Sequence, residues 1–66
     1  MKADRVEVSH DDQSKRWLIR IQVGEEVIRR LCDEAKDADE MTLRRAAVEI
    51  AADEGYSVDP SAVVFA

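Results

Sequence analysis

The sequence contains few of the residues that build disulfides, metal sites or membrane spans. It has one cysteine, Cys32, and one histidine, His10. An internal disulfide is therefore excluded, and a structural zinc site lacks ligands. No apolar run is long enough for a signal peptide or for crossing a bilayer, so we expect a soluble, cytoplasmic protein with no membrane partner. One proline, two glycines and the lack of repeats predict a chain that is ordered throughout.

Length and charge set two further limits. A chain of 66 residues predicts a single small globular domain over residues 1–66, which can bury only about 60% of its unfolded surface. A domain of this size without a disulfide or a metal gains stability from a partner subunit. Fifteen acidic and ten basic residues are mixed along the chain and give a net charge of −5. Such a surface favours solubility and repels the phosphates of nucleic acids.

The first third of the chain alternates between apolar and polar residues in two runs. Turn-forming residues from His10 to Lys15 separate the runs, and this pattern predicts a β-hairpin. The two apolar sets share a face only if the numbers of paired residues have an odd sum. One such register places Val8 opposite Trp17, with a loop over residues 11–14. Registers with the neighbouring odd sums remain open. The apolar residues of the two runs are Val6, Val8, Trp17, Ile19, Ile21 and Val23.

Two helices are predicted after Gly24, where the apolar spacing changes from alternation to steps of three and four. The first covers about residues 25–37 and has an acidic start, which suits a helix N-terminus. The second begins at a cap, Asp39 or Thr42, and ends at Gly55. The apolar stripe of the first helix is Val27, Ile28, Leu31, Cys32, Ala35 and Ala38, and that of the second is Leu43, Ala46, Ala47, Ile50 and Ala51.

A turn at residues 59–61 and an apolar run over residues 62–66 predict a last short strand. The predicted fold class is therefore α+β, with the order ββααβ. It is a three-stranded antiparallel sheet, in chain order, with two helices packed on one face. We expect a buried centre formed by Ile19, Ile21, Ile28, Leu31, Leu43 and Ile50.

No group of residues in the sequence forms a convincing catalytic or metal-binding set. His10, Asp11 and Asp12 are contiguous in the predicted hairpin loop, where aspartate side chains that hydrogen-bond a turn explain them. Cys32 lies on an apolar stripe as a small buried residue, and Trp17 begins the core face of its strand. We therefore expect no enzyme activity, no cofactor, no bound metal and no small-molecule substrate.

The arginine pairs of the two predicted helices each have an acidic residue one turn away. This pattern is typical of a solvated helix face and not of a phosphate-binding surface. The spacings are Glu25 to Arg29, Glu26 to Arg30, Arg29 to Asp33, Glu40 to Arg44 and Arg45 to Glu49.

The run from Ile19 through Gly24 into the first predicted helix resembles part of the ribbon-helix-helix family of DNA-binding repressors and antitoxins. The resemblance covers about half of the chain. It implies a strand-paired dimer in which Arg20 and Gln22 read bases in a DNA groove. The predicted turn between the helices carries Asp39 and Glu40 at the place where that family presents phosphate-binding amides.

The sequence thus favours a small, acidic, non-catalytic module that binds a protein partner or associates with itself. The motivation is a small core together with an apolar residue, Leu18, on the otherwise polar face of the second strand. The residues expected to face the partner are Leu18, Arg20 and Gln22. The alternative is a ribbon-helix-helix-like DNA-binding protein or antitoxin, which net charge and the acidic turn disfavour, so we expect no nucleic-acid partner.

Overall fold

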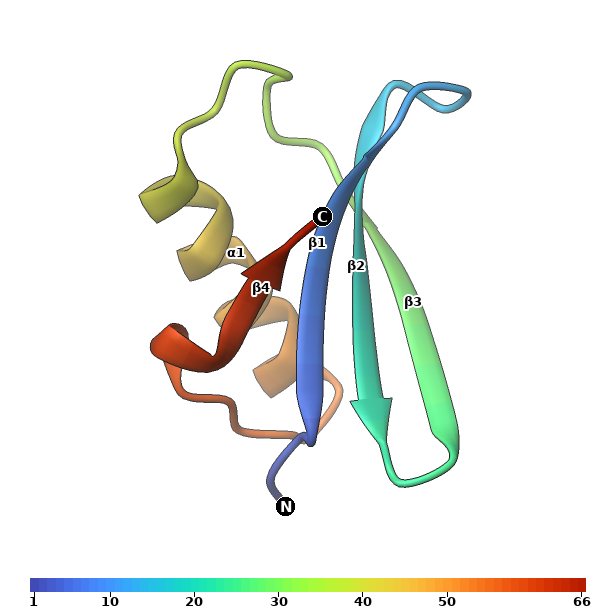
Figure 1. The fold of residues 1–66 in the computed structure, drawn as a ribbon, viewed down its shortest axis with the longest axis vertical. Coiled ribbons are helices and arrows are strands. Elements are labelled where there is room, and N and C mark those ends of the chain that lie inside the picture. Colours follow the sequence, from blue (N-terminus) through green and yellow to red (C-terminus); the bar gives the residue numbers. More distant parts are fainter.

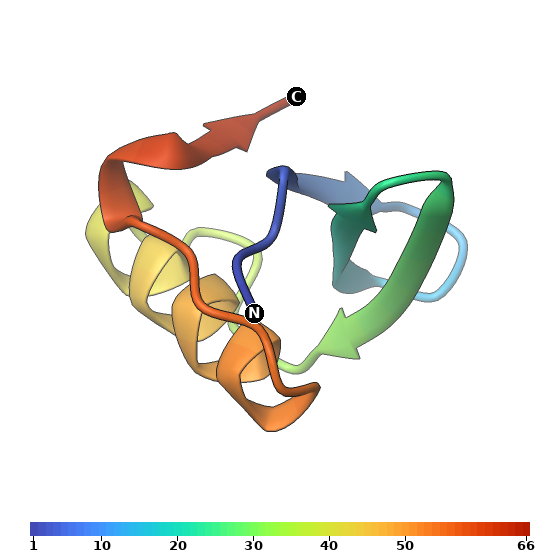
Figure 2. The same ribbon diagram turned by 90° about the horizontal axis from the view of Figure 1, so that it is seen from below.

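The computed structural model describes residues 1–66, which fold into one four-stranded sheet with one helix against it (Figure 1). The strand order across the sheet is β3-β2-β1-β4, so β3 and β4 form its two edges. The N-terminal residues lie beside Ser57 (Figure 2). The elements are β1 (Arg5–Asp11), β2 (Arg16–Val23), β3 (Glu26–Cys32), α1 (Glu40–Asp53), the 3-10 helix η1 (Pro60–Ala62) and β4 (Val63–Phe65).

The predicted hairpin is present as the antiparallel pair β1 and β2. Paired residues have an odd sum, as predicted, but the register is the neighbouring one, with Val8 opposite Ile19 and His10 opposite Trp17. In this register Asp11 still belongs to β1 and pairs with Arg16. The face is the predicted one, since every odd-sum register places Val6, Val8, Trp17, Ile19, Ile21 and Val23 on the same side, and the ladder extends over seven residue pairs.

The prediction of a first helix over residues 25–37 was wrong, because residues 26–32 form β3. Val23 pairs with Glu26, so only Gly24 and Glu25 connect β2 to β3. Gly24 has a φ of +60° and Glu25 has no positive φ, which is the pattern of a type II′ hairpin turn with glycine in its first central position. The glycine therefore reverses the chain into a second hairpin instead of starting a helix.

The strand is favoured here because it completes the sheet. β2 has a second edge, and pairing with β3 satisfies its backbone groups. The alternation of β3 then directs Ile28 and Cys32 to the core face, beside Ile21 and Trp17. A helix over the same residues would have left that edge of β2 to the last strand, which has only three residues. The α+β class is correct, but the sheet has four strands and the structure has one α-helix.

The last strand also differs from the prediction. β4 pairs with β1 and not with β2, and the pairing is parallel, with Val6 opposite Val63 and Val8 opposite Phe65. The predicted sheet was entirely antiparallel, whereas the observed sheet is mixed. Since β3 already occupies the other edge of β2, the chain crosses through α1 to the far edge and joins β1 there.

The second predicted helix is confirmed as α1, and its two ends have the predicted caps. Asp39 is the N-cap and accepts a hydrogen bond from the Thr42 backbone N–H at 2.8 Å. At the other end Gly55 has a φ of +90° and donates to Ala52 O, while Tyr56 N–H donates to Ala51 O. These two bonds form a Schellman motif. α1 falls short of the length and apolar character that crossing a bilayer requires.

The Asp39 cap makes the free energy of unfolding depend on pH in the acid range. Hydrogen bonds from the Thr42 hydroxyl and backbone N–H hold the pKa of Asp39 below its ordinary value of 3.8. A lowered pKa stabilises the folded state above pH 3.8, and this stabilisation is lost as the pH falls through the lowered pKa. In Asp39→Asn the amide oxygen can still cap the helix but does not titrate. We expect the wild type to have a higher Tm than Asp39→Asn at neutral pH, and we expect this difference to shrink below pH 3.8.

Thermal melts followed by circular dichroism over this acid range measure the difference in Tm between the two proteins. The other capping carboxylate, Asp59, whose pKa is lowered by its bonds from the Ser61 N–H and hydroxyl, is present in both and cancels. A difference in Tm that stays constant with pH would contradict a charged cap at Asp39.

The core lies between the sheet and α1. Four residues of the sheet are fully buried: Val6, Val8, Ile19 and Ile21. Ile19 and Ile21 belong to the six residues predicted for the buried centre, so the prediction is confirmed for these two. Leu43 is also buried, whereas Ile28 and Ile50 are half-buried. Leu31 was predicted at the centre but is 46% exposed, because the alternation of β3 directs it away from the core. The complete buried set is Ala3, Val6, Val8, Ile19, Ile21, Cys32, Leu43, Ala47, Ala51, Val58 and Val63.

Candidate functional site

The sheet face opposite α1 carries a grid of side chains that no other element covers. We call it the outer face, and it combines the alternate residues of β1, β2 and β3 in three cross-strand rows. The rows are Arg5–Gln22–Val27, Glu7–Arg20–Arg29 and Ser9–Leu18–Leu31. Val64 of β4 extends the middle row on the far side of Glu7.

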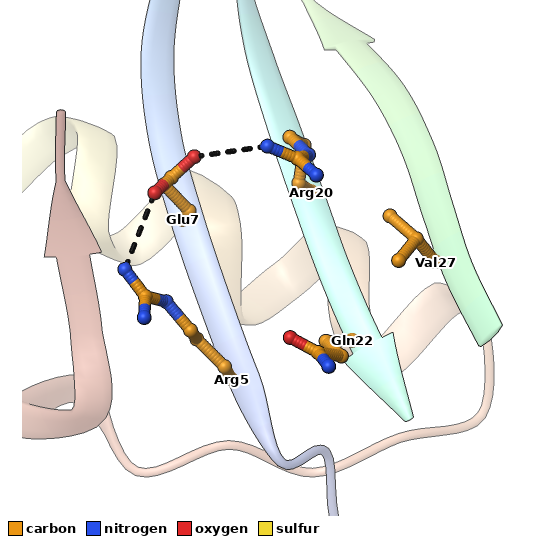
Figure 3. Close-up of a pocket in the computed structure, with 5 residues that line it drawn as sticks. All are labelled: Arg5, Glu7, Arg20, Gln22 and Val27. Atoms are coloured by element: carbon orange, nitrogen blue, oxygen red, sulfur yellow. Dashed lines mark hydrogen bonds and ion pairs between the residues drawn. The ribbon is translucent and has the colours of Figure 1, made fainter. Parts of the chain in front are cut away.

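One carboxylate on this face, that of Glu7, forms ion pairs with two arginines. Its Oε2 lies 3.3 Å from an Arg5 nitrogen and its Oε1 lies 3.4 Å from an Arg20 nitrogen (Figure 3). With Gln22 and Val27 these residues line an open hollow of about 270 Å³. Both arginine side chains remain roughly half exposed, so their remaining N–H donors point to solvent.

Arg29 lies directly opposite Arg20 in the sheet and has no ion pair. The two-residue turn places the pairs Val23–Glu26 and Ile21–Ile28 in hydrogen-bonded positions, so Arg20 and Arg29 form a non-hydrogen-bonded pair. Side chains approach more closely in such pairs, and like charges directly opposite each other are destabilising. An anionic group between the two guanidinium groups would remove this repulsion.

Aliphatic side chains border the charged row on both sides. Leu31 is 46% exposed and Val27 is 38% exposed, and these two residues flank Arg29 along β3. Leu18 lies beside Leu31 and is half-buried. Val64 is a third exposed aliphatic side chain, at the end of the middle row. The outer face therefore offers both apolar contact area and N–H donors.

The charge of this face is opposite to the charge of the rest of the molecule. Its grid contains three arginines and one glutamate, a local charge of +2, on a chain whose net charge is −5. The remainder of the surface therefore carries the difference, −7. The outer face therefore attracts an acidic ligand, whereas the rest of the surface, taken together, repels it.

The three residues predicted to face a partner all lie on the outer face. Leu18, Arg20 and Gln22 are successive outward residues of β2, the middle strand of the grid. Their role as partner contacts stays a prediction. Sequence reasoning did not find Arg5 or the outward residues of β3. For β3 a signal was present: the residues after Gly24 also alternate, with Val27, Arg29 and Leu31 on one side.

The loop at the end of the first hairpin is a hydrogen-bonded turn, as predicted. Asp11 accepts hydrogen bonds from the Gln13 N–H and the Ser14 hydroxyl. His10 Nδ1 lies 2.9 Å from Asp12 Oδ1. Across the whole chain, no three His, Cys, Asp or Glu side chains lie close enough together to hold a metal ion.

Trp17 and Cys32 lie on the core side of the sheet, away from the outer face. The register places His10, Trp17 and Cys32 in one row, so His10 is closer to the cysteine than the predicted fold implied. The Trp17 ring lies between them, packs edge-on against His10 at 4.9 Å, and donates its Nε1–H to Ala35 O. Cys32 is buried, as predicted, but as the last residue of β3 and not on a helix.

Of the predicted helical ion pairs only one is present, on α1, where Arg44 pairs with Glu40 at 2.8 Å. The predicted pair of Arg45 with Glu49 on the same helix is absent. The pairs expected for residues 25–33 are absent because these residues form a turn and a strand. Arg30 instead crosses the core side of the sheet edge to pair with Glu54 at the end of α1.

Comparison of the chain with protein-family models, curated proteins and solved structures gives no match. The structural basis of the ribbon-helix-helix resemblance is also missing, because Gly24 leads into a strand and only one α-helix follows. Function is therefore inferred from the chemistry of the outer face.

Proposed function

We propose that the protein is a non-catalytic binding module whose outer face receives an acidic, partly apolar segment of a partner protein. The observation that carries the proposal is the placement of Arg29 directly opposite Arg20, with no carboxylate beside it. A partner carboxylate in this position would accept hydrogen bonds from both guanidinium groups, and charge-assisted bonds of this kind are the stronger ones.

The apolar neighbours of the arginines support a protein partner. Leu18, Leu31 and Val27 offer aliphatic surface that complements the apolar side chains of a peptide. The outer face contains no aromatic residue, so bases have no aromatic ring on which to stack. The charge of −7 on the other faces repels a long polyanion, whereas a short acidic segment needs to approach the outer face alone.

Selection of random displayed peptides on the immobilised protein tests this proposal. We expect enrichment of peptides that combine Asp or Glu with aliphatic residues. Enriched peptides, synthesised and titrated by fluorescence anisotropy, are expected to bind Arg29→Glu on the order of tenfold more weakly than the wild type. Their affinity is also expected to fall with rising salt. The matched control is Arg45→Glu, the same charge change at an exposed residue of α1 that has no ion pair.

The proposal fails if no acidic motif is enriched, or if Arg45→Glu weakens binding as much as Arg29→Glu does. Selection from random DNA duplexes tests the alternative that the protein binds DNA. We expect no enriched sequence there. An enriched duplex motif that is lost in Arg20→Ala would overturn the protein-binding proposal in favour of DNA recognition.

A further inference from the structure

The edge strand β3 has an unpaired side along its whole length. It is the outermost strand of the sheet, next to β2 only. α1 packs against β1 and β4 at the other side of the sheet, so it does not cover β3 (Figure 1). β3 spans seven residues, from Glu26 to Cys32, without a proline or a bulge. Such an edge is a template for another strand.

The two-residue turn determines which backbone groups face outward. Val23 and Glu26 close the turn as a hydrogen-bonded pair, so even-numbered residues of β3 direct their backbone groups to β2. The N–H and C=O groups of Val27, Arg29 and Leu31 therefore point to the open side. Another strand must pair with these three residues.

The side chains on one side of β3 are complementary to those of a second β3 strand that runs antiparallel to it. On the core side, β3 presents Glu26, Ile28 and Arg30 in that order. A reversed copy presents Arg30, Ile28 and Glu26. Aligning the two at Ile28 places a glutamate opposite an arginine on each side of an apolar pair.

We infer that a second copy of this chain pairs antiparallel with β3 about a two-fold axis at Ile28. In this register Ile28 lies opposite its counterpart, and Glu26 of each copy lies opposite Arg30 of the other. All three are non-hydrogen-bonded pairs, in which side chains are closest. Val27 and Arg29 exchange backbone hydrogen bonds with the partner's Arg29 and Val27. The result is one continuous eight-stranded sheet with closed-dimer symmetry.

The neighbouring registers are less favourable. A two-fold axis at Arg29 would place its guanidinium opposite that of the second copy, and an axis at Arg30 would do the same with Arg30. Like charges directly opposite each other are destabilising in a sheet. An axis at Val27 would leave only residues 26–28 of each strand paired. The axis at Ile28 joins five residues of each strand with opposite charges facing.

The existing contacts of these residues are compatible with the dimer. Arg30 already pairs with Glu54, but a guanidinium has five N–H donors and can bind a second carboxylate. Ile28 is only half-buried in the single chain, so the partner's Ile28 covers apolar area that the helix leaves exposed. The dimer is independent of the acidic ligand proposed for the outer face, since its ion pairs lie on the opposite side of the sheet.

A charge exchange tests both the dimer and its register. Sedimentation equilibrium over about a hundredfold range of concentration is expected to show wild-type dimers. Glu26→Arg and Arg30→Glu are each expected to weaken self-association by on the order of tenfold, because each places like charges opposite each other twice. An equimolar mixture of the two variants is expected to dimerise as the wild type does, since every mixed pair joins opposite charges. Glu49→Arg, an exposed residue of α1, is the matched control.

Circular dichroism establishes that both variants are folded. Arg30→Gln replaces Arg30→Glu if repulsion between the introduced carboxylate and Glu54 unfolds that chain, since glutamine is neutral and its amide can still donate to Glu54. With Arg30→Gln, association is expected to weaken by a smaller factor. A wild-type protein that is monomeric at every concentration would overturn the inference. So would dimers that Glu26→Arg leaves unchanged, or folded charge-reversed variants whose mixture fails to recover association. The peptide titrations with Arg29→Glu report separately on the outer face.

Discussion

Truncation of Ile21 to alanine is expected to remove a large part of the free energy that stabilises the fold. Ile21 is fully buried on β2, between Val6 of β1 and Ile28 of β3. Replacing a buried isoleucine by alanine costs about 2 to 5 kcal/mol, because apolar contacts are lost and a cavity remains. A chain of this length has a free energy of unfolding of about 3 to 10 kcal/mol in total. Urea titration followed by circular dichroism measures the loss.

Leu31→Ala is the matched comparison. Leu31 lies on β3 with its side chain directed to the outer face and 46% exposed, so its truncation is expected to cost less than about 1 kcal/mol. The helical arrangement predicted from sequence would make Leu31 a central core residue with a cost as large as that of Ile21. Equal destabilisation by the two substitutions would therefore contradict the strand assignment of residues 26–32.

A larger side chain at Ala47 is expected to disrupt the contact between α1 and the sheet. Ala47 is fully buried, and it lies between Leu43 and Ala51 on the stripe of the helix that faces the core. Ala47→Leu adds three carbon atoms to this packed layer, and overpacking of this kind costs about 1 to 3 kcal/mol. The midpoint of urea unfolding is expected to fall accordingly.

Ala52→Leu provides the control for helix propensity and composition. Ala52 belongs to the same helix but is exposed, and alanine and leucine are both good helix formers. Its stability is expected to match that of the wild type to within about 0.5 kcal/mol. Equal effects at Ala47 and Ala52 would show that close packing of α1 on the sheet does not limit the size of residue 47.

The elements that could be predicted from sequence are those whose own residues fit only one kind of secondary structure. The first hairpin has two alternating runs around a turn, and α1 has a cap, Asp39, an apolar stripe and a terminating glycine, Gly55. The β3 segment is different because its apolar residues fit a helix by their three-and-four spacing and also fit a strand. The edge of β2 decides between the two states, and that edge lies outside the segment.

The same error limited what could be predicted of the candidate site. Leu18, Arg20 and Gln22 could be placed on one face because β2 was identified correctly. Arg29 was assigned to a helix with acidic neighbours one turn away, and this spacing made it look neutralised. In the strand those neighbours are not adjacent to it, and Arg29 lies beside Arg20 without a counterion. The charge pattern of the outer face thus depends on the topology and not on spacing along the chain.

The parallel pairing of β1 with β4 has a kinetic consequence. Val6 pairs with Val63, so formation of this pair of strands closes a loop of almost the entire chain. The other two strand pairs close over short turns and are local. Loop-closure entropy therefore favours early pairing of β1, β2 and β3, with β4 arriving last. Until it docks, the edge of β1 is open to strands of other molecules, and we expect this interval of refolding to be the one most prone to aggregation.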